Sequence, residues 1–394
     1  MDAIWIKDLN TVLDDNKILT LAYGDRIPMT DNVKMMFEVE TLVNLSSATV
    51  SWAGIIYVSD TDLDWAPVIE SWVRKRGTER QHILRALIQK WLGKCSPIDP
   101  DPCFTFISRH TKEVMTDGRV GKITSFITLF QGLTERSGSE ILASSSNLEL
   151  DLEKFFLYCM CWSQGALLQA DNRMKFDQWL RNKDDNKVMP EVEEGETIYE
   201  YFVNSSTCKW EKWIPPKWEY PAGETLNFSN LLVPTMDSTR AIYVTQQIHK
   251  QKAPVMIVGA EGTAKTSVQL MLLANQDPTK MWTKRINFSS ATTPGMAQFS
   301  IESELDKRGG KNYGPSNGKK KTISFDDISL PEVNKWGDQT TLELVRLAVE
   351  YGGFCFLDKD RRGDFKTCED LQYLAAMQHP GSGKNDILNR LERN

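Results

Sequence analysis

The 394-residue chain contains little of what builds disulfide frameworks or zinc sites. Its seven cysteines form no CxxC pair, and its four histidines are far apart in the sequence. An odd number of cysteines without such pairs, in a chain of this length, predicts free thiols in a reducing compartment. The scattered histidines argue against a zinc centre.

A long apolar run is also missing. The most apolar stretch, residues 155–168, is shorter than the roughly 20 residues that cross a bilayer, and Ser163 and Gln164 interrupt it. Residues 1–8 have neither the basic segment nor the long apolar segment of a secretion signal. We therefore expect no contact with a membrane and a cytoplasmic location.

Neither sign of charge dominates the chain. Lys and Arg number 47, Asp and Glu number 53, and the formal net charge is −6. A mildly acidic chain is a poor candidate for binding the phosphate backbone of a nucleic acid. The 41% apolar and 25% charged residues are an ordinary globular balance, and the length predicts two or three domains.

The sequence pattern divides the chain into residues 1–59, 60–215 and 216–394. The first region contains strand-like pieces and a turn, and the second is mainly helical because apolar residues recur at helical spacing. The expected strands cover residues 18–21, 33–37 and 54–58, with the turn at residues 24–28. The expected helices cover residues 65–74, 79–92, 121–134 and 150–168.

A β-hairpin is expected near the end of the helical region. Residues 197–203 and 208–213 alternate in polarity around an Asn-Ser-Ser turn. Trp210, Trp213 and Trp218 interleave with lysines, a pattern that could bind single-stranded nucleic acid or proline-rich peptides. Acidic residues lie among the same lysines, which favours a hairpin whose tryptophans cover a seam between domains.

The third region alternates strands with helices. Its continuous apolar runs are typical of parallel strands that are buried on both faces. The expected strands cover residues 253–258, 285–288, 321–325 and 371–377, and the expected helices include residues 241–250 and 341–351. This alternation predicts an α/β fold with a doubly wound parallel sheet.

A phosphate-binding loop is expected between the strand that ends at Val258 and the following helix. Its residues are Gly259, Ala260, Glu261, Gly262, Thr263, Ala264, Lys265 and Thr266. Glycines let backbone N–H groups approach phosphate oxygens, and the helix N-terminus favours anions. Lys265 would reach the β- and γ-phosphates of ATP, and Thr266 would place its hydroxyl on Mg²⁺. Ala264 stands where Gly is usual, so Gly262 is expected to supply the turn; a plain strand–helix turn is the simpler alternative.

Two carboxylates, Asp326 and Asp327, follow the expected strand at residues 321–325. Asp326 would hold Mg²⁺, directly or through water, as a Walker B aspartate does. Asp327 stands where a general base would polarise the attacking water. AAA+ ATPases usually have the longer Glu there, so turnover by this site is in question. The alternative, that both carboxylates only cap the next segment, is weaker because a phosphate-binding loop is also expected.

Two further positions are candidate nucleotide contacts. Val233 and Pro234 precede the strand before the loop by one helix, and their apolar surface could line the adenine base. A simple entry loop explains them nearly as well. Arg393 could face a neighbouring subunit's nucleotide as an arginine finger, or it could be an exposed residue near the end of a basic helix.

Several segments of the chain resemble dynein heavy chain, and most closely the axonemal (ciliary) heavy chains. They are residues 2–6 (DAIWI), 9–16 (LNTVLDDN), 262–266 (GTAKT), 287–294 (NFSSATTP), 334–339 (NKWGDQ), 374–377 (LAAM) and 379–381 (HPG). The resemblance covers essentially the whole chain and is strongest at its two ends. We therefore expect the chain to be part of something larger.

The resemblance implies a place in a ring of six AAA+ modules that moves toward the minus end of microtubules by ATP hydrolysis. Residues 1–59 resemble the end of the second module, residues 60–215 its helical lid and connection, and residues 216–394 the large subdomain of the third module without its lid. The implied partners are the other modules of the same heavy chain and, through the parent protein, intermediate chains, light chains and microtubules. The implied location is the cytoskeleton of the ciliary axoneme.

Two positions depart from that family. Trp52 stands where the family usually has an Arg that reaches the first module's nucleotide, and an indole cannot supply that charge. Ser324 interrupts the apolar strand before Asp326. The favoured interpretation is an ATP- and Mg²⁺-binding AAA+ segment of a ciliary dynein heavy chain. The alternatives are a regulatory or structural nucleotide-binding segment without useful ATPase activity, and an unrelated AAA+ remodeller of protein or nucleic acid.

Overall fold

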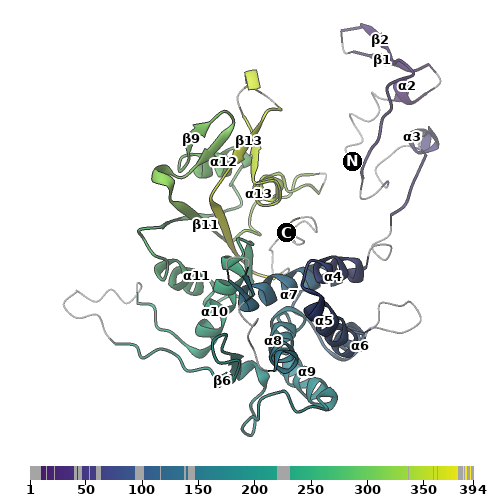
Figure 1. Ribbon diagram of the computed structural model, residues 1–394. Coiled ribbons are helices and arrows are strands. Elements are labelled where there is room, and N and C mark those ends of the chain that lie inside the picture. The colour runs from purple at the N-terminus through teal and green to yellow at the C-terminus, as the bar shows by residue number, and fades with distance from the viewer. Residues whose placement is uncertain are drawn as a thin grey trace. The chain divides into compact units, whose positions relative to one another are not determined.

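The computed structural model (Figure 1) divides the chain into two compact units, Met1–Leu63 and Asp64–Asn394. It describes residues 10–391 except residues 15, 22, 40–41, 43–46, 53, 59–63, 94–101, 116, 137–138, 141–146, 220–230, 336, 358, 362, 380–384, 386 and 388–390. Within this part of the chain no helix is long and apolar enough to cross a membrane. The six cysteines that lie in it are all free.

The smaller unit has short elements. They are α2 (Asn10–Leu13), β1 (Ile18–Thr20), β2 (Arg26–Pro28) and α3 (Ser47–Trp52), with β1 and β2 paired as an antiparallel hairpin. β1 confirms the first expected strand, and β2 occupies the last three residues of the expected turn at residues 24–28. The strands expected at residues 33–37 and 54–58 are wrong, because neither described segment pairs with another strand. Apolar residues predict a strand only where a neighbour can accept its backbone hydrogen bonds.

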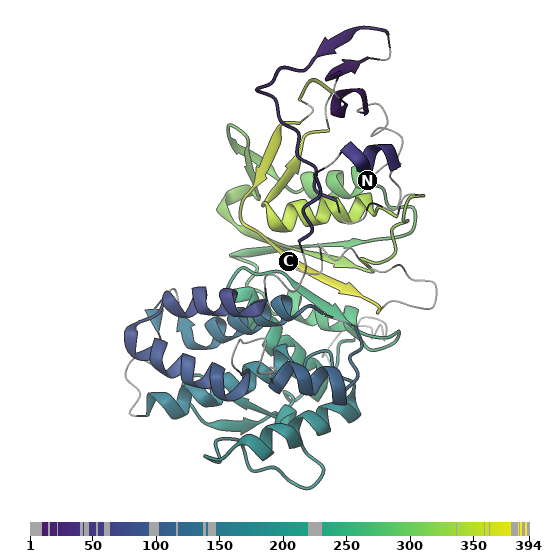
Figure 2. The same cartoon turned by 90° about the vertical axis from the view of Figure 1, so that its right-hand side faces the viewer.

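The first half of the larger unit is a helical bundle, which is dark blue to teal in Figures 1 and 2. Its helices are α4 (Trp65–Arg74), α5 (Thr78–Trp91), α6 (Pro102–His110), α7 (Arg119–Thr134), α8 (Leu148–Ser163) and α9 (Ala170–Lys183). Residues 155–161 of α8 are at most 1% exposed, because the other helices surround this apolar helix. Burial raises the pKa of the Cys159 and Cys161 thiols, so both are packing residues.

Helix α8 is shorter than the sequence predicts. The expectation was a helix to residue 168, but α8 ends at Ser163. The backbone N–H groups of Gln164 and Gly165 both donate to the carbonyl of Met160, at 2.9 and 3.2 Å, and this closes the helix. Apolar periodicity continues past that point, which explains the error.

The second half of the larger unit contains a four-stranded parallel sheet with the order β7-β14-β11-β8. The strands are β7 (Val255–Val258), β8 (Met281–Asn287), β11 (Lys320–Asp326) and β14 (Leu371–Met377). All four expected strands are confirmed, although β8 begins four residues earlier than predicted. β11, which ends at Asp326, is therefore flanked by β14 and β8.

Helices cover both faces of this sheet, as the doubly wound prediction requires. They are α10 (Met236–Lys250), α11 (Lys265–Ala274), α12 (Pro294–Glu302) and α13 (Thr340–Glu350). In β11, Ile323 and Phe325 belong to the apolar core that α12 and α13 complete. Thr322 points the other way, since its hydroxyl lies 3.3 Å from Nε2 of His249 in α10. Polar residues are thus tolerated on one face of the strand, and buried Ser324 does not interrupt it.

The structure contains a second four-stranded sheet, which the sequence analysis did not predict. Its order is β12-β13-β10-β9, and its strands are β9 (Asp306–Gly309), β10 (Asn312–Gly314), β12 (Gly353–Cys355) and β13 (Phe365–Cys368). β10 pairs in parallel with β13, which is distant in the sequence. Strands of three or four residues carry too little periodicity to be detected without their partners.

A hairpin joins the helical half to the sheet half. It consists of the 3₁₀ turn η1 (Ile198–Glu200), β5 (Tyr201–Val203) and β6 (Trp210–Lys212). Trp213 is 5% exposed, stacks on Phe202 with ring centroids 4.2 Å apart, and meets Tyr243 of α10 edge-on at 5.1 Å. The indole of Trp210 donates to the carbonyl of Val188 at 2.8 Å. Trp210 and Trp213 thus pack within the protein, as expected of a hairpin that covers a seam, and do not form an exposed binding platform.

Helices α7 and α10 also meet closely at this seam. A Cβ added to Gly132 of α7 would lie 2.4 Å from the backbone carbonyl oxygen of Gln247 in α10, so only glycine fits there. Tyr243, Val244 and Ile248 of α10 pack against the core of the helical half. The first helix of the sheet half is therefore part of the packing of the helical half.

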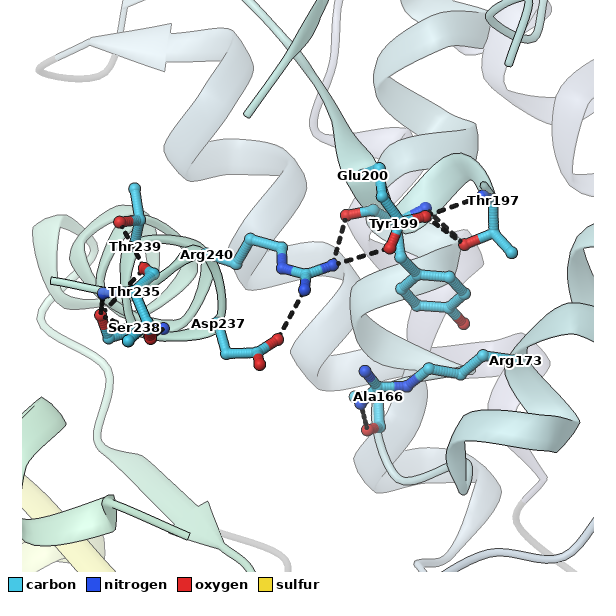
Figure 3. A network of polar contacts seen from close by, with 10 residues as sticks. All are labelled: Ala166, Arg173, Thr197, Tyr199, Glu200, Thr235, Asp237, Ser238, Thr239 and Arg240. Carbon is cyan, nitrogen blue, oxygen red and sulfur yellow. Dashed lines mark hydrogen bonds and ion pairs between the residues drawn. The ribbon is translucent and has the colours of Figure 1, made fainter. Parts of the chain in front are cut away.

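Arg240 of α10 makes the polar link across the seam (Figure 3). Its Nη1 donates to the backbone carbonyl of Tyr199 and to Oε1 of Glu200, both at 3.1 Å, and its Nη2 donates to Asp237 at 2.5 Å. Glu200 is itself held by the capping box that it forms with Thr197. The guanidinium thus bridges α10 and the hairpin.

Replacing Arg240 with Met should lower the melting temperature of the chain by several degrees. Met keeps the apolar stem, but the Tyr199 carbonyl and Glu200 lose their donor, a change of about 1–3 kcal/mol. Arg74→Met is the matched control, because that side chain is 73% exposed and its pair with Glu70 should contribute little. Equal thermal shifts for the two variants would contradict a specific role for Arg240.

Candidate functional site

The expected phosphate-binding loop lies between β7 and α11. The N–H of Gly259 donates to the carbonyl of Met377 at 3.2 Å, which ties the start of the loop to the neighbouring strand β14. The hydroxyl of Thr263 donates to the carbonyl of Ala260 at 2.8 Å and closes the loop on itself. Residues 260–264 are exposed. The loop is therefore anchored at its base and open to solvent at its turn, as a cradle for phosphate requires.

Two residues of this loop have left-handed backbone conformations. Gly262 has φ = 72°, and Ala264, the residue before α11, has φ = 60°. The expectation that Gly262 replaces the usual Gly before the lysine is thus incomplete, because Ala264 adopts the conformation that this Gly normally provides. A Cβ in this region costs roughly 1–2 kcal/mol, which the loop retains as strain.

The carboxylate of Asp326 meets the hydroxyl of Thr266 at the carboxyl end of β11. Thr266 Oγ1 donates to Oδ2 at 3.0 Å and to Oδ1 at 3.2 Å, although the two residues are 60 positions apart. Thr266 lies in the first turn of α11, and Asp326 is 5% exposed. A hydroxyl and a carboxylate are the hard oxygen donors that Mg²⁺ prefers, so this pair fits the expected metal.

The amine of Lys265 lies over the same loop. Its Nζ donates to the carbonyl of Ala260 at 2.6 Å. The long side chain is thus folded back across the turn, within the loop whose N–H groups would surround a phosphate. Exchange of a neutral carbonyl for an anionic oxygen would strengthen this hydrogen bond.

Asp327 has an unusual backbone for a residue with a side chain. Its φ is 54°, in the left-handed region, where aspartate is better tolerated than most residues. The N–H of Ile328 then donates to Ala376 of β14 at 3.1 Å, which holds the chain as it leaves the sheet. The Asp327 carboxylate is half-buried and has no hydrogen-bond partner among the described residues. It could therefore accept a hydrogen bond from a water molecule.

Two site residues were missed by sequence reasoning. Arg285 of β8 places Nη2 2.6 Å from Oδ2 of Asp326. Gln269 of α11, which is 1% exposed, donates to the carbonyl of Phe325 at 3.2 Å and so ties the helix to β11. A basic residue in the strand at residues 285–288 was visible in the sequence, but its role depends on β8 lying next to β11.

Several of the nucleotide contacts expected from the sequence remain predictions. Val233 and Pro234 lie just before Thr235, which caps α10, and Val233 is 48% exposed. A contact with adenine is not tested by this geometry. Arg393 lies outside the described residues. Trp52 ends α3, and its side chain is likewise outside the described part.

The site defines a class of protein. A parallel sheet with a glycine-containing loop before a helix, facing an aspartate at the end of an adjacent strand, is the core of the P-loop nucleotide-binding fold. A mainly helical half precedes this core in the chain.

Two family profiles match the chain. Residues 100–214 match the dynein heavy chain AAA lid domain, and residues 220–394 match the P-loop containing dynein motor region. The chain is 42% identical to "Dynein gamma chain, flagellar outer arm" of Chlamydomonas reinhardtii and 40% identical to "Dynein axonemal heavy chain 8" of Homo sapiens. Each alignment covers 100% of this chain and 8% of the relative. The chain belongs to the dynein heavy chain family, and it spans about 8% of the length of these relatives.

Replacing Ala264 with Gly should stabilise the chain by about 0.5–1 kcal/mol, because relief of left-handed strain exceeds the entropic cost of glycine. Thermal unfolding measures the change as a small rise in melting temperature. Ala260→Gly is the control, since Ala260 is exposed in the same loop and has no positive φ. A lower melting temperature for Ala264→Gly would contradict the assigned strain.

Proposed function

We propose that the chain binds ATP with Mg²⁺ at residues 259–266, as part of a ciliary dynein heavy chain. The meeting of Thr266 and Asp326 at 3.0 Å carries this proposal. A plain strand–helix turn does not require a buried carboxylate beside the first turn of its helix. The oxygen pair would hold Mg²⁺ together with phosphate oxygens and water. Bound Mg²⁺ would supply positive charge to the β- and γ-phosphates.

Each part of the loop has a role in this binding. The backbone N–H groups after Gly259 and the N-terminus of α11 would hold phosphate oxygens. Lys265 would turn its amine from the Ala260 carbonyl to the β- and γ-phosphates. Val233 and Pro234 would line the adenine base, and Arg393 would reach a neighbouring module's nucleotide. These last two roles follow from sequence position alone.

We infer that hydrolysis at this site is slow. Asp327 would act as the general base, but its side chain is one methylene shorter than the usual Glu. Its φ of 54° fixes the backbone direction from which the short side chain starts. Ground-state phosphate binding depends on the loop and not on Asp327, so binding should persist where catalysis is weak.

The proposed wider function is that of the dynein heavy chain to which this chain would belong. We propose that the chain acts with other AAA+ modules of the same heavy chain, in a minus-end-directed microtubule motor of the ciliary axoneme. Intermediate chains, light chains and microtubules would be partners only through the rest of that heavy chain. The relatives that support this context carry the words flagellar outer arm or axonemal in their names.

A regulatory nucleotide site is the second candidate function. The shorter reach of Asp327, which starts from a left-handed backbone, favours it over a working ATPase. Nucleotide held without rapid turnover would act by its presence, stabilising one arrangement of the loop and sheet. Binding and hydrolysis assays on the same sample separate the two candidates.

Lys265→Ala should weaken binding of MgATP by roughly tenfold to 100-fold, because a charge-assisted contact of about 1.5–3 kcal/mol is lost. Equilibrium titration with a fluorescent ATP analogue measures the two dissociation constants. Lys280→Ala is the matched control, because its side chain is 84% exposed and the residue directly precedes β8, at the end of the sheet opposite the loop. Equal dissociation constants for the wild type and Lys265→Ala would refute the phosphate-binding assignment.

Asp327→Glu should accelerate hydrolysis at least tenfold, since a correctly placed general base contributes about 10²–10⁴ in rate. The wild-type chain should hydrolyse bound ATP well below about 1 s⁻¹, the lower end of ordinary enzyme turnover. Single-turnover measurements beside a binding titration test both expectations. Asp327→Asn is the control and should bind ATP as the wild type does. A wild-type rate above about 1 s⁻¹ would contradict slow hydrolysis.

A further inference from the structure

The Walker B carboxylate has a cationic partner within the same sheet. Nη2 of Arg285 lies 2.6 Å from Oδ2 of Asp326, and their side chains are 36% and 8% exposed. The same oxygen accepts the hydroxyl of Thr266 at 3.0 Å. One carboxylate oxygen thus accepts hydrogen bonds both from a guanidinium and from the hydroxyl that would ligate Mg²⁺.

The sheet itself holds Arg285 in this position. β8 and β11 pair in parallel without interruption, with Arg285 opposite Ser324 and Asn287 opposite Asp326. Side chains two residues apart in a strand share a face, so Arg285 and Asp326 project on the same side. Lys284 projects on the other side, where its Nζ lies 2.7 Å from Glu304. The contact of Arg285 with Asp326 is therefore set by strand register and not by a loop.

We propose that Arg285 competes with Mg²⁺ for Asp326 and so sets the Mg²⁺ concentration at which this site holds nucleotide. The inference rests on the proposed function. Whether Asp326 contacts the metal directly or through water, the interaction needs lone pairs of the carboxylate, and Oδ2 already has two donors. Two cations that share one carboxylate also repel each other, and a buried carboxylate is poorly screened by salt.

Removal of the guanidinium should therefore strengthen Mg²⁺ binding. Like charges close to one another repel more strongly near a protein than in bulk water, because the effective dielectric constant is lower there. Arg285 is partly exposed, and a more distant and solvated charge has a smaller effect. We expect Arg285→Gln to lower the midpoint of the Mg²⁺ titration by about tenfold.

The experiment titrates Mg²⁺, buffered with a chelator, against the chain and a fluorescent ADP analogue at fixed concentration, and records bound nucleotide. Arg285→Lys keeps the charge and should have a midpoint close to that of the wild type. Lys284→Gln removes one positive charge from the adjacent residue without touching Asp326, and should also match the wild type. Circular dichroism confirms that each variant is folded. If Arg285→Gln does not fold, Arg285→Met is compared with Arg285→Lys in the same titration.

The outcomes separate this inference from the function on which it rests. A lower midpoint for Arg285→Gln alone supports competition. An unchanged or higher midpoint, or an equal shift in Lys284→Gln, overturns the role of Arg285 while nucleotide binding stands. Absence of nucleotide binding by the wild type at every Mg²⁺ concentration overturns both proposals.

Discussion

A buried carboxylate at the end of β11 is the constraint around which the sheet half is organised. Asp326 is 5% exposed, and a charge in such a place needs hydrogen-bond donors. Thr266 supplies one from the first turn of α11, and Arg285 supplies another from β8. The position of β11 between β14 and β8 makes both possible, because it places the strand beside the phosphate loop's anchor and beside the arginine. The loss of one donor would therefore leave this buried carboxylate less well satisfied.

Two of the described residues with left-handed backbone conformations lie at the carboxyl end of the parallel sheet. Ala264, in the loop after β7, and Asp327, directly after β11, both have positive φ. Such conformations persist only where the surrounding structure determines them. Here the parallel sheet, the tie from Gly259 to Met377 and the tie from Gln269 to Phe325 provide that support. The sheet and these two hydrogen bonds thus hold both strained residues in place.

The seam between the helical half and the sheet half relates this site to the preceding lid region. Arg240 and Tyr243 lie on α10, the helix that precedes the P-loop strand, and both contact the hairpin that ends the helical half. A displacement of the hairpin would therefore act first on α10. The hairpin lies in the part of the chain that matches the dynein heavy chain AAA lid domain, and α10 lies in the part that matches the P-loop containing dynein motor region. The contacts of Arg240 and Tyr243 therefore join these two parts.

The sequence by itself determined the elements whose signal is local. The helix α4 and the strand β14 have the predicted bounds, and the P-loop and the pair Asp326 and Asp327 are recognisable from spacing alone. Tertiary structure decided what depends on neighbours: the second sheet, the unpaired segments at residues 33–37 and 54–58, and the partnership of Arg285 with Asp326. Strand order and register are non-local, because hydrogen bonds between strands join residues that are far apart in the chain. A residue's role at a sheet edge is fixed only when its neighbouring strand is known.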